Sequence, residues 1–274
     1  MPSAAQEVTV TYQDRVAIIT LNRPKKLNAM GADHYWELGQ KMREVAERDD
    51  IFITVLTGTG RFFSAGADVQ ATRPAGDSDD ARRAILRNFV ANNLDITHTF
   101  SHHPKILVVA LNGPAVGLSA ALTAFGDFIY AAPHTFLLTP FSSLGLVAEG
   151  GASRAFVERL GISKANEALI MSKKITVEEL VQTGYVNKVF EAPGGRDDDK
   201  GFLKLVLAEV EERMGMHLNQ DSMVKIKALV RRPERELLDR QNVYEVFGGM
   251  DRFMAGIPQQ EFMKIATGQK KHKL

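Results

Sequence analysis

Short apolar runs alternate with amphipathic segments over the first two thirds of the chain. The run Ile106–Leu111 is uninterrupted, rich in β-branched side chains and too short for a helix, which predicts a buried strand. Residues 8–13 alternate apolar and polar side chains, and Asp14-Arg15 before the apolar run 16–21 predicts a tight hairpin. Further short apolar runs predict strands at residues 51–56, 128–130 and 186–190.

Helical spacing of apolar residues accounts for most of the remaining core. It predicts helices at residues 30–47, 84–100, 118–125, 153–160, 165–171 and 177–180. Residues 71–83 are polar and predict a surface loop. Beyond residue 193 only helical segments are predicted, at residues 203–214, 223–230 and 237–247. Alternating strands and helices followed by helices alone indicate an α/β core at residues 1–192 and a helical C-terminal region at residues 193–274.

Composition narrows the classes of function without choosing one. The chain has 274 residues, a net charge of +1 and ordinary hydrophobic and charged fractions of 45% and 24%. This charge gives no reason to expect nucleic acid as a partner. With no cysteine, disulfides, thiolate metal sites and cysteine nucleophiles are excluded. No apolar run approaches the roughly 18 residues of a membrane span, and the N-terminus lacks a secretory signal pattern.

Three glycine-containing segments carry the candidate chemistry. Two of them follow predicted strands: Phe63-Ser64-Ala65-Gly66-Ala67-Asp68 and Asn112-Gly113-Pro114-Ala115-Val116-Gly117. The third is Leu144-Gly145-Leu146-Val147-Ala148-Glu149-Gly150-Gly151. Glu149 is a lone carboxylate between an apolar run and a glycine pair. Because a desolvated charge is costly, it is either exposed at a turn or kept in a pocket for chemistry.

Together with Asn22-Arg23-Pro24, Leu27-Asn28-Ala29 and Asp127-Phe128-Ile129-Tyr130-Ala131, these segments resemble the crotonase (enoyl-CoA hydratase/isomerase) family. The resemblance spans roughly residues 8–191 and rests on the order and spacing of the motifs. It implies an α/β ClpP/crotonase-like spiral of ββα turns with a helical C-terminal trimerisation region. It also implies an acyl-CoA substrate and a homotrimer or homohexamer.

The same resemblance assigns roles to the two glycine loops. The backbone N–H groups of Ala67 and Leu118 are expected to form an oxyanion hole for the thioester enolate. Leu118 begins a predicted helix, so its N–H is among those that a helix leaves unpaired. The first loop is expected to contact the CoA adenine. The expected substrate-binding residues are Ala65, Gly66, Ala67, Asp68, Val69 and Leu118.

The expected reaction follows from the positions at which this chain differs from the family pattern. Hydratases of the family use two glutamates, at positions where this chain has Ala121 and Phe141, so ordinary hydration is not expected. Glu149 resembles the glutamate of the peroxisomal Δ3-Δ2-enoyl-CoA isomerase branch of fungal type. That likeness implies a proton shuttle from C2 to C4 of a 3-enoyl-CoA, in β-oxidation of unsaturated fatty acids. The alternatives are a dienoyl-CoA isomerase and a non-catalytic acyl-CoA-binding protein.

Asn93 is a further candidate for the catalytic group, because its amide could orient Glu149 or polarise the substrate; a solvated helix residue is the alternative. No metal or redox cofactor is expected, since CoA is part of the substrate. Gly117-Leu118-Ser119-Ala120-Ala121 superficially matches the nucleophile elbow of a serine hydrolase, which would also need a converging histidine and acid. His102-His103 is a poor metal pair and is interpreted as surface histidines.

The chain ends with Lys270-Lys271-His272-Lys273-Leu274. The tripeptide His272, Lys273 and Leu274 resembles a basic variant of the Ser-Lys-Leu peroxisomal signal. It implies a peroxisomal location and a peroxisomal import receptor as a partner. A basic disordered end is the alternative.

Overall fold

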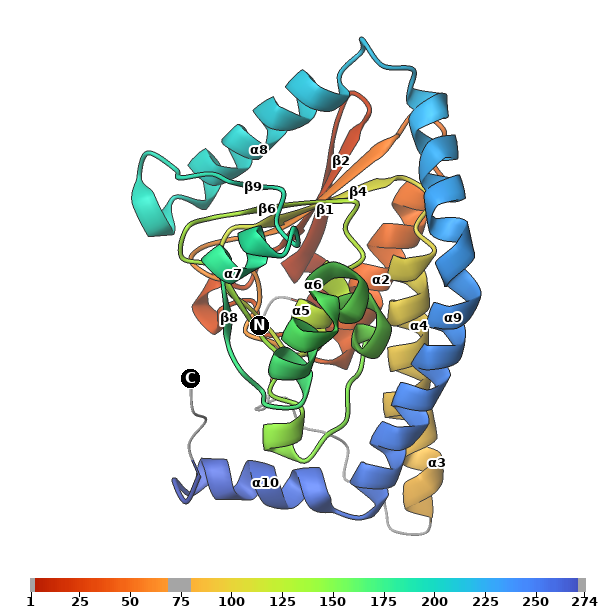
Figure 1. Ribbon diagram of the computed structural model, residues 1–274, viewed down its shortest axis with the longest axis vertical. Coiled ribbons are helices and arrows are strands. Elements are labelled where there is room, and N and C mark those ends of the chain that lie inside the picture. Colours follow the sequence, from red (N-terminus) through yellow and green to blue (C-terminus); the bar gives the residue numbers. More distant parts are fainter. Residues whose placement is uncertain (1–2, 69–79, 271–274) are drawn as a thin grey trace.

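The computed structural model describes residues 3–68 and 80–270 of the chain (Figure 1). Residues 71–79 of the surface loop predicted at 71–83, the predicted ligand contact Val69 and the predicted signal tripeptide lie outside the described residues. The loop prediction is wrong at residues 81–83, which begin a helix. Within those that are described, strands form two sheets with helices packed around them.

The larger sheet has six strands in the order β1-β2-β3-β4-β6-β9, and only the β1–β2 pair is antiparallel. The smaller sheet has the order β5-β7-β8. The bounds in the larger sheet are β1 Val8–Gln13, β2 Val16–Leu21, β3 Ile53–Gly58, β4 Ile106–Leu111, β6 Phe128–Ala131 and β9 Lys188–Val189. In the smaller sheet they are β5 Ala115–Val116, β7 Phe136–Leu138 and β8 Ile175–Thr176. The predicted hairpin is confirmed, and the strand predicted at 51–56 begins two residues later.

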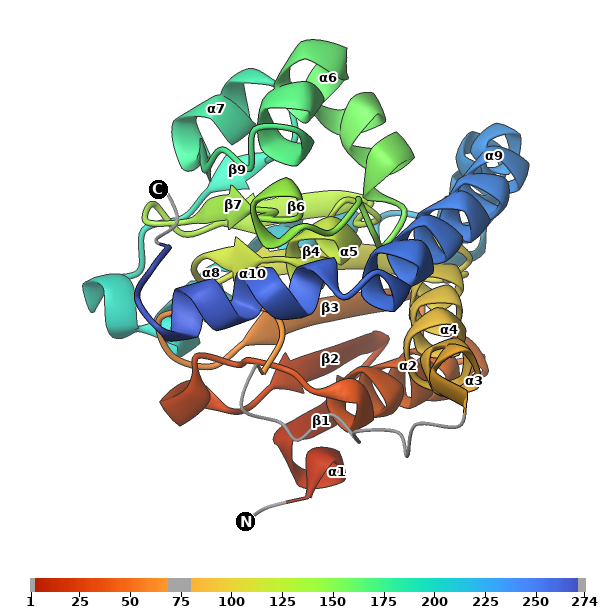
Figure 2. The same cartoon turned by 90° about the horizontal axis from the view of Figure 1, so that it is seen from below.

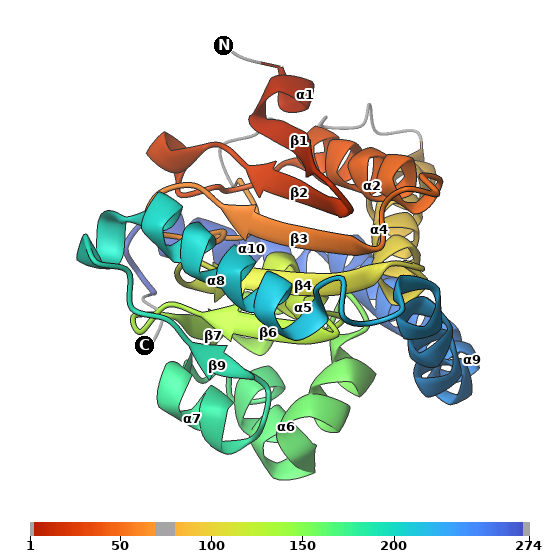
Figure 3. The ribbon, with the colours of Figure 1, turned by 90° about the horizontal axis from the view of Figure 1, so that it is seen from above.

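The large sheet is buried on both faces, which explains its uninterrupted apolar runs. In β4, Val108 and Ala110 pack in the same apolar cluster as Phe202 and Val206 of α8 (Asp199–Met214). The alternate residue Val109 belongs to the other cluster, with side chains of α2 (Ala32–Ala46), α4 (Ala91–Ser101) and α5 (Leu118–Thr123). Figure 3 shows α8 lying across the sheet. The region after residue 193 therefore supplies one layer of the core.

The predicted helices are present, but most of them have different limits. The helix predicted at 84–100 is α3 (Ala81–Ile85), a π-helical turn η3 (Leu86–Val90) and α4. Gly161 breaks α6 (Ala152–Leu169) with φ 75°, as predicted. The separate helices predicted at 223–230 and 237–247 are one helix, α9 (Gln220–Met254), which continues through Pro233. The other elements are α1 (Ala4–Glu7), α7 (Val177–Gln182), α10 (Ile257–Ala266), η1 (Pro24–Lys26), η4 (Ser142–Leu144) and η5 (Gly195–Asp197).

Ion pairs on either side of Pro233 hold α9 to the body. Arg231 and Lys227 both pair with Asp127, at 3.0 and 2.7 Å, and Glu234 pairs with Arg154 of α6 at 2.8 Å. In Figures 1 and 2, α9 runs beside α4, and α10 crosses the body at the end of α9. None of the helices at residues 3–68 and 80–270 is both long and apolar enough to span a membrane.

Candidate active site

Two buried asparagines fix the start of the first glycine loop. Both Asn28 and Asn112 donate from Nδ2 to the carbonyl oxygen of Phe62, at 2.8 and 3.1 Å. Asn112 also accepts from the N–H of Gly58 through Oδ1, at 3.0 Å. These two motif asparagines therefore hold the turn before the first glycine loop in place through hydrogen bonds.

The first loop lies directly against the second. Ser64 and Ala115 form a parallel bridge, and the N–H of Val116 donates to the carbonyl of Ser64 at 2.9 Å. Gly66 has φ +85°, and a Cβ there would lie 2.8 Å from the carbonyl oxygen of Val116. Only glycine allows this close approach of the two loops.

The predicted oxyanion donors sit on these adjoining loops. Met30 donates to the carbonyl of Gly66 and accepts from the N–H of Asp68, at 2.8 and 3.0 Å, so in this parallel bridge the N–H of Ala67 points away from Met30. Leu118 is the first residue of α5, and its N–H precedes the first hydrogen bond of the helix, from Ala121 to Gly117. The structure thus places both predicted donors on neighbouring loops of the folded molecule.

Three buried hydroxyl groups form a hydrogen-bonded chain that connects the two loops. Tyr35 Oη lies 2.9 Å from Ser119 Oγ, which lies 2.9 Å from Ser64 Oγ. Because Ser64 donates its proton to the carbonyl of Asn28 at 2.8 Å, Ser119 donates to Ser64 and Tyr35 donates to Ser119. Burial raises the pKa of Tyr35, with a smaller contribution from the charge of Glu149, so Tyr35 remains a donor.

Glu149 lies beside the second loop, partly buried in the segment that precedes α6. Asn93 of α4 is buried and donates from Nδ2 to Glu149 Oε2 at 3.2 Å, so it is not a solvated helix residue, and its role in the reaction stays a prediction. Gly150 has φ +71°, and a Cβ on it would lie 2.7 Å from Cδ1 of Leu118 and 3.0 Å from Cβ of Ala121. The segment carrying Glu149 is therefore pressed against the first turn of α5.

This arrangement agrees with comparisons to known proteins. The model of the enoyl-CoA hydratase/isomerase family matches residues 11–194, most of the chain. The chain belongs to this family. A Δ3,5-Δ2,4-dienoyl-CoA isomerase of Pyricularia oryzae is 59% identical over 97% of this chain and 98% of its own. The 3,2-trans-enoyl-CoA isomerase of Saccharomyces cerevisiae is 33% identical over 98% and 97%.

The fold agrees as well. The solved structure of an enoyl-CoA hydratase/isomerase from Pseudoalteromonas atlantica matches with a TM-score of 0.81, covering 98% of this chain and 100% of its own at 23% identity. The crotonase fold predicted from the motifs is therefore confirmed. Identity is nevertheless higher to a dienoyl-CoA isomerase than to the yeast 3,2-trans-enoyl-CoA isomerase, the branch to which the glutamate motif pointed.

Nonpolar side chains occupy the two positions where hydratases of the family have glutamates. Ala121 is fully buried beneath Gly150, and Phe141 is also buried. The carbonyl of Phe141 accepts from the N–H of Leu146 at 2.8 Å and so helps to shape the turn that leads to Glu149. Neither Ala121 nor Phe141 has a side-chain group that can transfer a proton, and the expectation against hydration stays a prediction.

The remaining predicted ligand contacts have structural partners. The N–H of Ala65 donates to the carbonyl of Leu27 at 2.8 Å. Asp68 forms an ion pair with Arg23 at 3.3 Å, and Arg23 also pairs with Glu7 at 2.7 Å. Contact of this loop with adenine stays a prediction.

The structure also bears on two other sequence interpretations, the serine-hydrolase elbow at Ser119 and the surface histidine pair. Ser119 is buried and hydrogen bonded to Tyr35 and Ser64, and among the described residues no histidine is hydrogen bonded to it as a general base. The interpretation of His102 and His103 as two surface residues is wrong for His103. That side chain is buried against Thr54 at 2.8 Å, and burial lowers its pKa well below the usual value.

Glu245 is a site residue that the sequence did not reveal. It lies on α9, is buried, and accepts from the N–H groups of Gly151 and Ser153 at 2.7 and 2.8 Å. Its carboxylate thus caps the N-terminus of α6 and anchors the segment two residues after Glu149. Burial raises its pKa, and these hydrogen bonds oppose the rise. In the sequence it is one acid among many on a charged helix, because its partners are more than 90 residues away.

Proposed function

We propose that this chain is a Δ3,5-Δ2,4-dienoyl-CoA isomerase with Glu149 as the proton-transfer group. The observation that carries isomerase chemistry is the position of Glu149, held by Asn93 and pressed against the turn of Leu118. The choice of substrate follows the 59% identity to the Pyricularia oryzae enzyme over nearly the full length of both chains.

In the proposed reaction Glu149 removes a proton from C2 of a 3,5-dienoyl-CoA. The electron pair delocalises over C2, C4, C6 and the thioester oxygen, and the protonated Glu149 returns the proton to C6, which gives the 2,4-diene. The N–H groups of Ala67 and Leu118 stabilise the negative oxygen, at about 2.7–4 kcal/mol for each such donor in other enzymes. Atoms balance without water, metal or an electron acceptor.

A second candidate is the Δ3-Δ2-enoyl-CoA isomerase reaction, in which the proton returns to C4 of a monounsaturated chain. One carboxylate suffices for this shorter transfer. The arrangement favours it in one respect: the neighbouring buried carboxylate Glu245 is engaged with Gly151 and Ser153 and is not a second base beside Asn93.

Parallel assays distinguish these functions. The protein is incubated in heavy water with a 3,5-dienoyl-CoA and, separately, with a 3-enoyl-CoA of the same chain length. We expect faster conversion of the diene, deuterium incorporation and no hydroxyacyl product, with both activities lost in Glu149→Gln. Faster conversion of the 3-enoyl-CoA assigns the second function. Binding of both thioesters without turnover overturns both and identifies a non-catalytic acyl-CoA-binding protein.

We also propose peroxisomal import and assembly into a trimer or hexamer. His272, Lys273 and Leu274 support the first proposal, which a fluorescent fusion lacking these residues tests by losing its peroxisomal location. Exposed apolar side chains along α9 support the second. They are Ile226, Leu229, Val230, Val243, Tyr244 and Phe247.

A further inference from the structure

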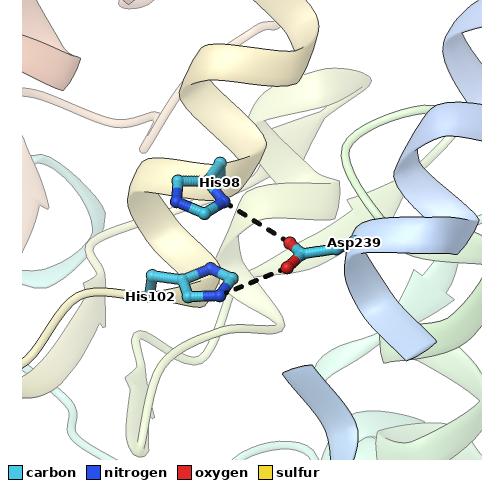
Figure 4. A group of neighbouring side chains, drawn as sticks. All are labelled: His98, His102 and Asp239. Carbon is cyan, nitrogen blue, oxygen red and sulfur yellow. Dashed lines mark hydrogen bonds and ion pairs between the residues drawn. The ribbon is translucent and has the colours of Figure 1, made fainter. Parts of the chain in front are cut away.

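Two histidines and an aspartate converge on the surface between α4 and α9 (Figure 4). His98 and His102 lie one helical turn apart at the C-terminal end of α4, and their rings stack with centroids 3.9 Å apart. Asp239 projects from α9 toward both rings. None of the three side chains takes part in the proposed isomerase chemistry.

The separations are compatible with a shared metal ion. His98 Nδ1 lies 3.4 Å from Oδ1 of Asp239, and His102 Nε2 lies 3.4 Å from Oδ2, which is long for N–H···O hydrogen bonds. Zinc–nitrogen and zinc–oxygen bonds near 2.0–2.2 Å place neighbouring tetrahedral ligands about 3.3–3.5 Å apart. The three candidate ligand atoms all lie within 4.8 Å of one another.

The hydrogen bonding of His102 also calls for a cation at this point. Ser101 Oγ donates its proton to the carbonyl of His98 at 3.2 Å and lies 3.0 Å from His102 Nδ1. Ser101 therefore accepts from Nδ1–H, which leaves the lone pair of Nε2 facing the Asp239 carboxylate. Two electron-rich groups face each other unless a proton or a metal ion lies between them.

We propose that His98, His102 and Asp239 form a binding site for a divalent first-row transition metal, with Zn²⁺ the best-fitting ion. Two imidazoles and one carboxylate are a typical zinc ligand set, and water completes the coordination because His98 and Asp239 are half exposed. The ion joins the helix that carries Asn93 to the helix that carries Glu245. It therefore acts as a clip between α4 and α9.

The binding test uses the full chain stripped of metal with a chelator and titrated with Zn²⁺ in a calorimeter. We expect one equivalent to bind to the wild type, and His102→Ala or Asp239→Asn to weaken this binding by on the order of tenfold or more. His217→Ala, which removes an exposed histidine elsewhere, should bind as the wild type does. Absence of Zn²⁺ binding, or equal binding by His102→Ala, overturns the site.

The clip is tested separately by thermal unfolding. Zn²⁺ above its dissociation constant should raise the Tm of the wild type and of His217→Ala, because it binds only the folded arrangement, and should leave Asp239→Asn unshifted. Tetrahedral Co²⁺ absorption in the wild type, lost in His98→Ala, supports direct ligation. An equal rise of Tm in Asp239→Asn shows that the ion acts elsewhere and overturns the clip.

Discussion

At the residue scale, the proposed chemistry depends on how a single flexible carboxylate is held. Glu149 belongs to an irregular segment, and the amide of Asn93, on a helix, limits where its Oε2 can lie. Proton transfer between carbon atoms requires short, aligned distances, and a small displacement of the acid–base group is costly in rate.

Asn93→Ala should therefore lower kcat by about 10–100-fold while leaving the folded structure intact. Steady-state kinetics with the better of the two enoyl-CoA substrates measure this loss. Asn92→Ala is the matched control, because the neighbouring Asn92 is only partly buried and its side chain donates to the carbonyl of Asn88, one turn earlier. An unchanged kcat in Asn93→Ala would contradict a positioning role.

A second carboxylate makes stability depend on pH. Burial, and then a hydrogen bond with Glu234, raise the pKa of Glu158 to about 7, while Arg154 opposes the rise from 3.2 Å. A raised pKa means that the folded state holds this proton more tightly than the unfolded chain. The associated stability is complete below pH 4.5, the ordinary value, and is lost as the pH rises to about 7.

Glu158→Gln should flatten this dependence, because a neutral amide replaces the titrating group. Urea unfolding at pH 5 and pH 8 measures the difference in free energy. We expect the wild type to lose more stability between these values than the variant, by on the order of 1 kcal/mol after solvent screening. Parallel pH dependence of the two proteins would assign the proton to another group.

At the scale of elements, regular periodicity was predictable and long-range partners were not. The uninterrupted run Ile106–Leu111 predicted a strand buried on both faces, and the hairpin at residues 8–21 followed from alternation and a turn. The strands β5 and β8 have two residues each, too few to show any period. Two separate helices were predicted at residues 223–230 and 237–247, whereas the structure has the single helix α9, which ion pairs on both sides of Pro233 hold to distant residues.

Some residues of the candidate site could be named from the sequence, and others could not. Ala67, Leu118 and Glu149 could be named because the motifs around them resemble those of the crotonase family. Tyr35, Ser64 and Glu245 could not, since their roles exist only once distant segments meet. The position of Asn93 was a hypothesis that needed the contact between α4 and the Glu149 segment.

The link from α9 to α6 gives a prediction at this scale. In Glu245→Gln, an amide N–H₂ group faces one of the two N–H donors of Gly151 and Ser153. We expect a loss of about 1–3 kcal/mol in unfolding free energy and a fall in kcat larger than the change in KM, because the segment of Glu149 loosens. Glu236→Gln, an exposed change on the same helix, is the control for both measurements. A stability loss with unchanged kcat would leave Glu245 a purely structural cap.

At the scale of the whole molecule, α9 is apolar on two sides. One side, with Leu238, Val246 and Met250, is buried against the body. Along the other, Leu229, Val230 and Tyr244 have 64–68% of their surface exposed. A helix on the surface of a monomer normally presents polar residues to water, so a contiguous apolar side marks a contact with another molecule.

We expect the outer side of α9 to pack against a second copy of the chain, in keeping with the predicted trimer or hexamer. Light scattering coupled to size-exclusion chromatography should then give about three or six times the 30.2 kDa chain mass. Leu229→Asp, which places a charge in the contact, should lower this mass, whereas the exposed Arg232→Ala should not. Because the inner side of the same helix carries Glu245, which anchors the segment after Glu149, dissociation should also reduce kcat. A wild type that elutes at the mass of one chain would contradict both expectations.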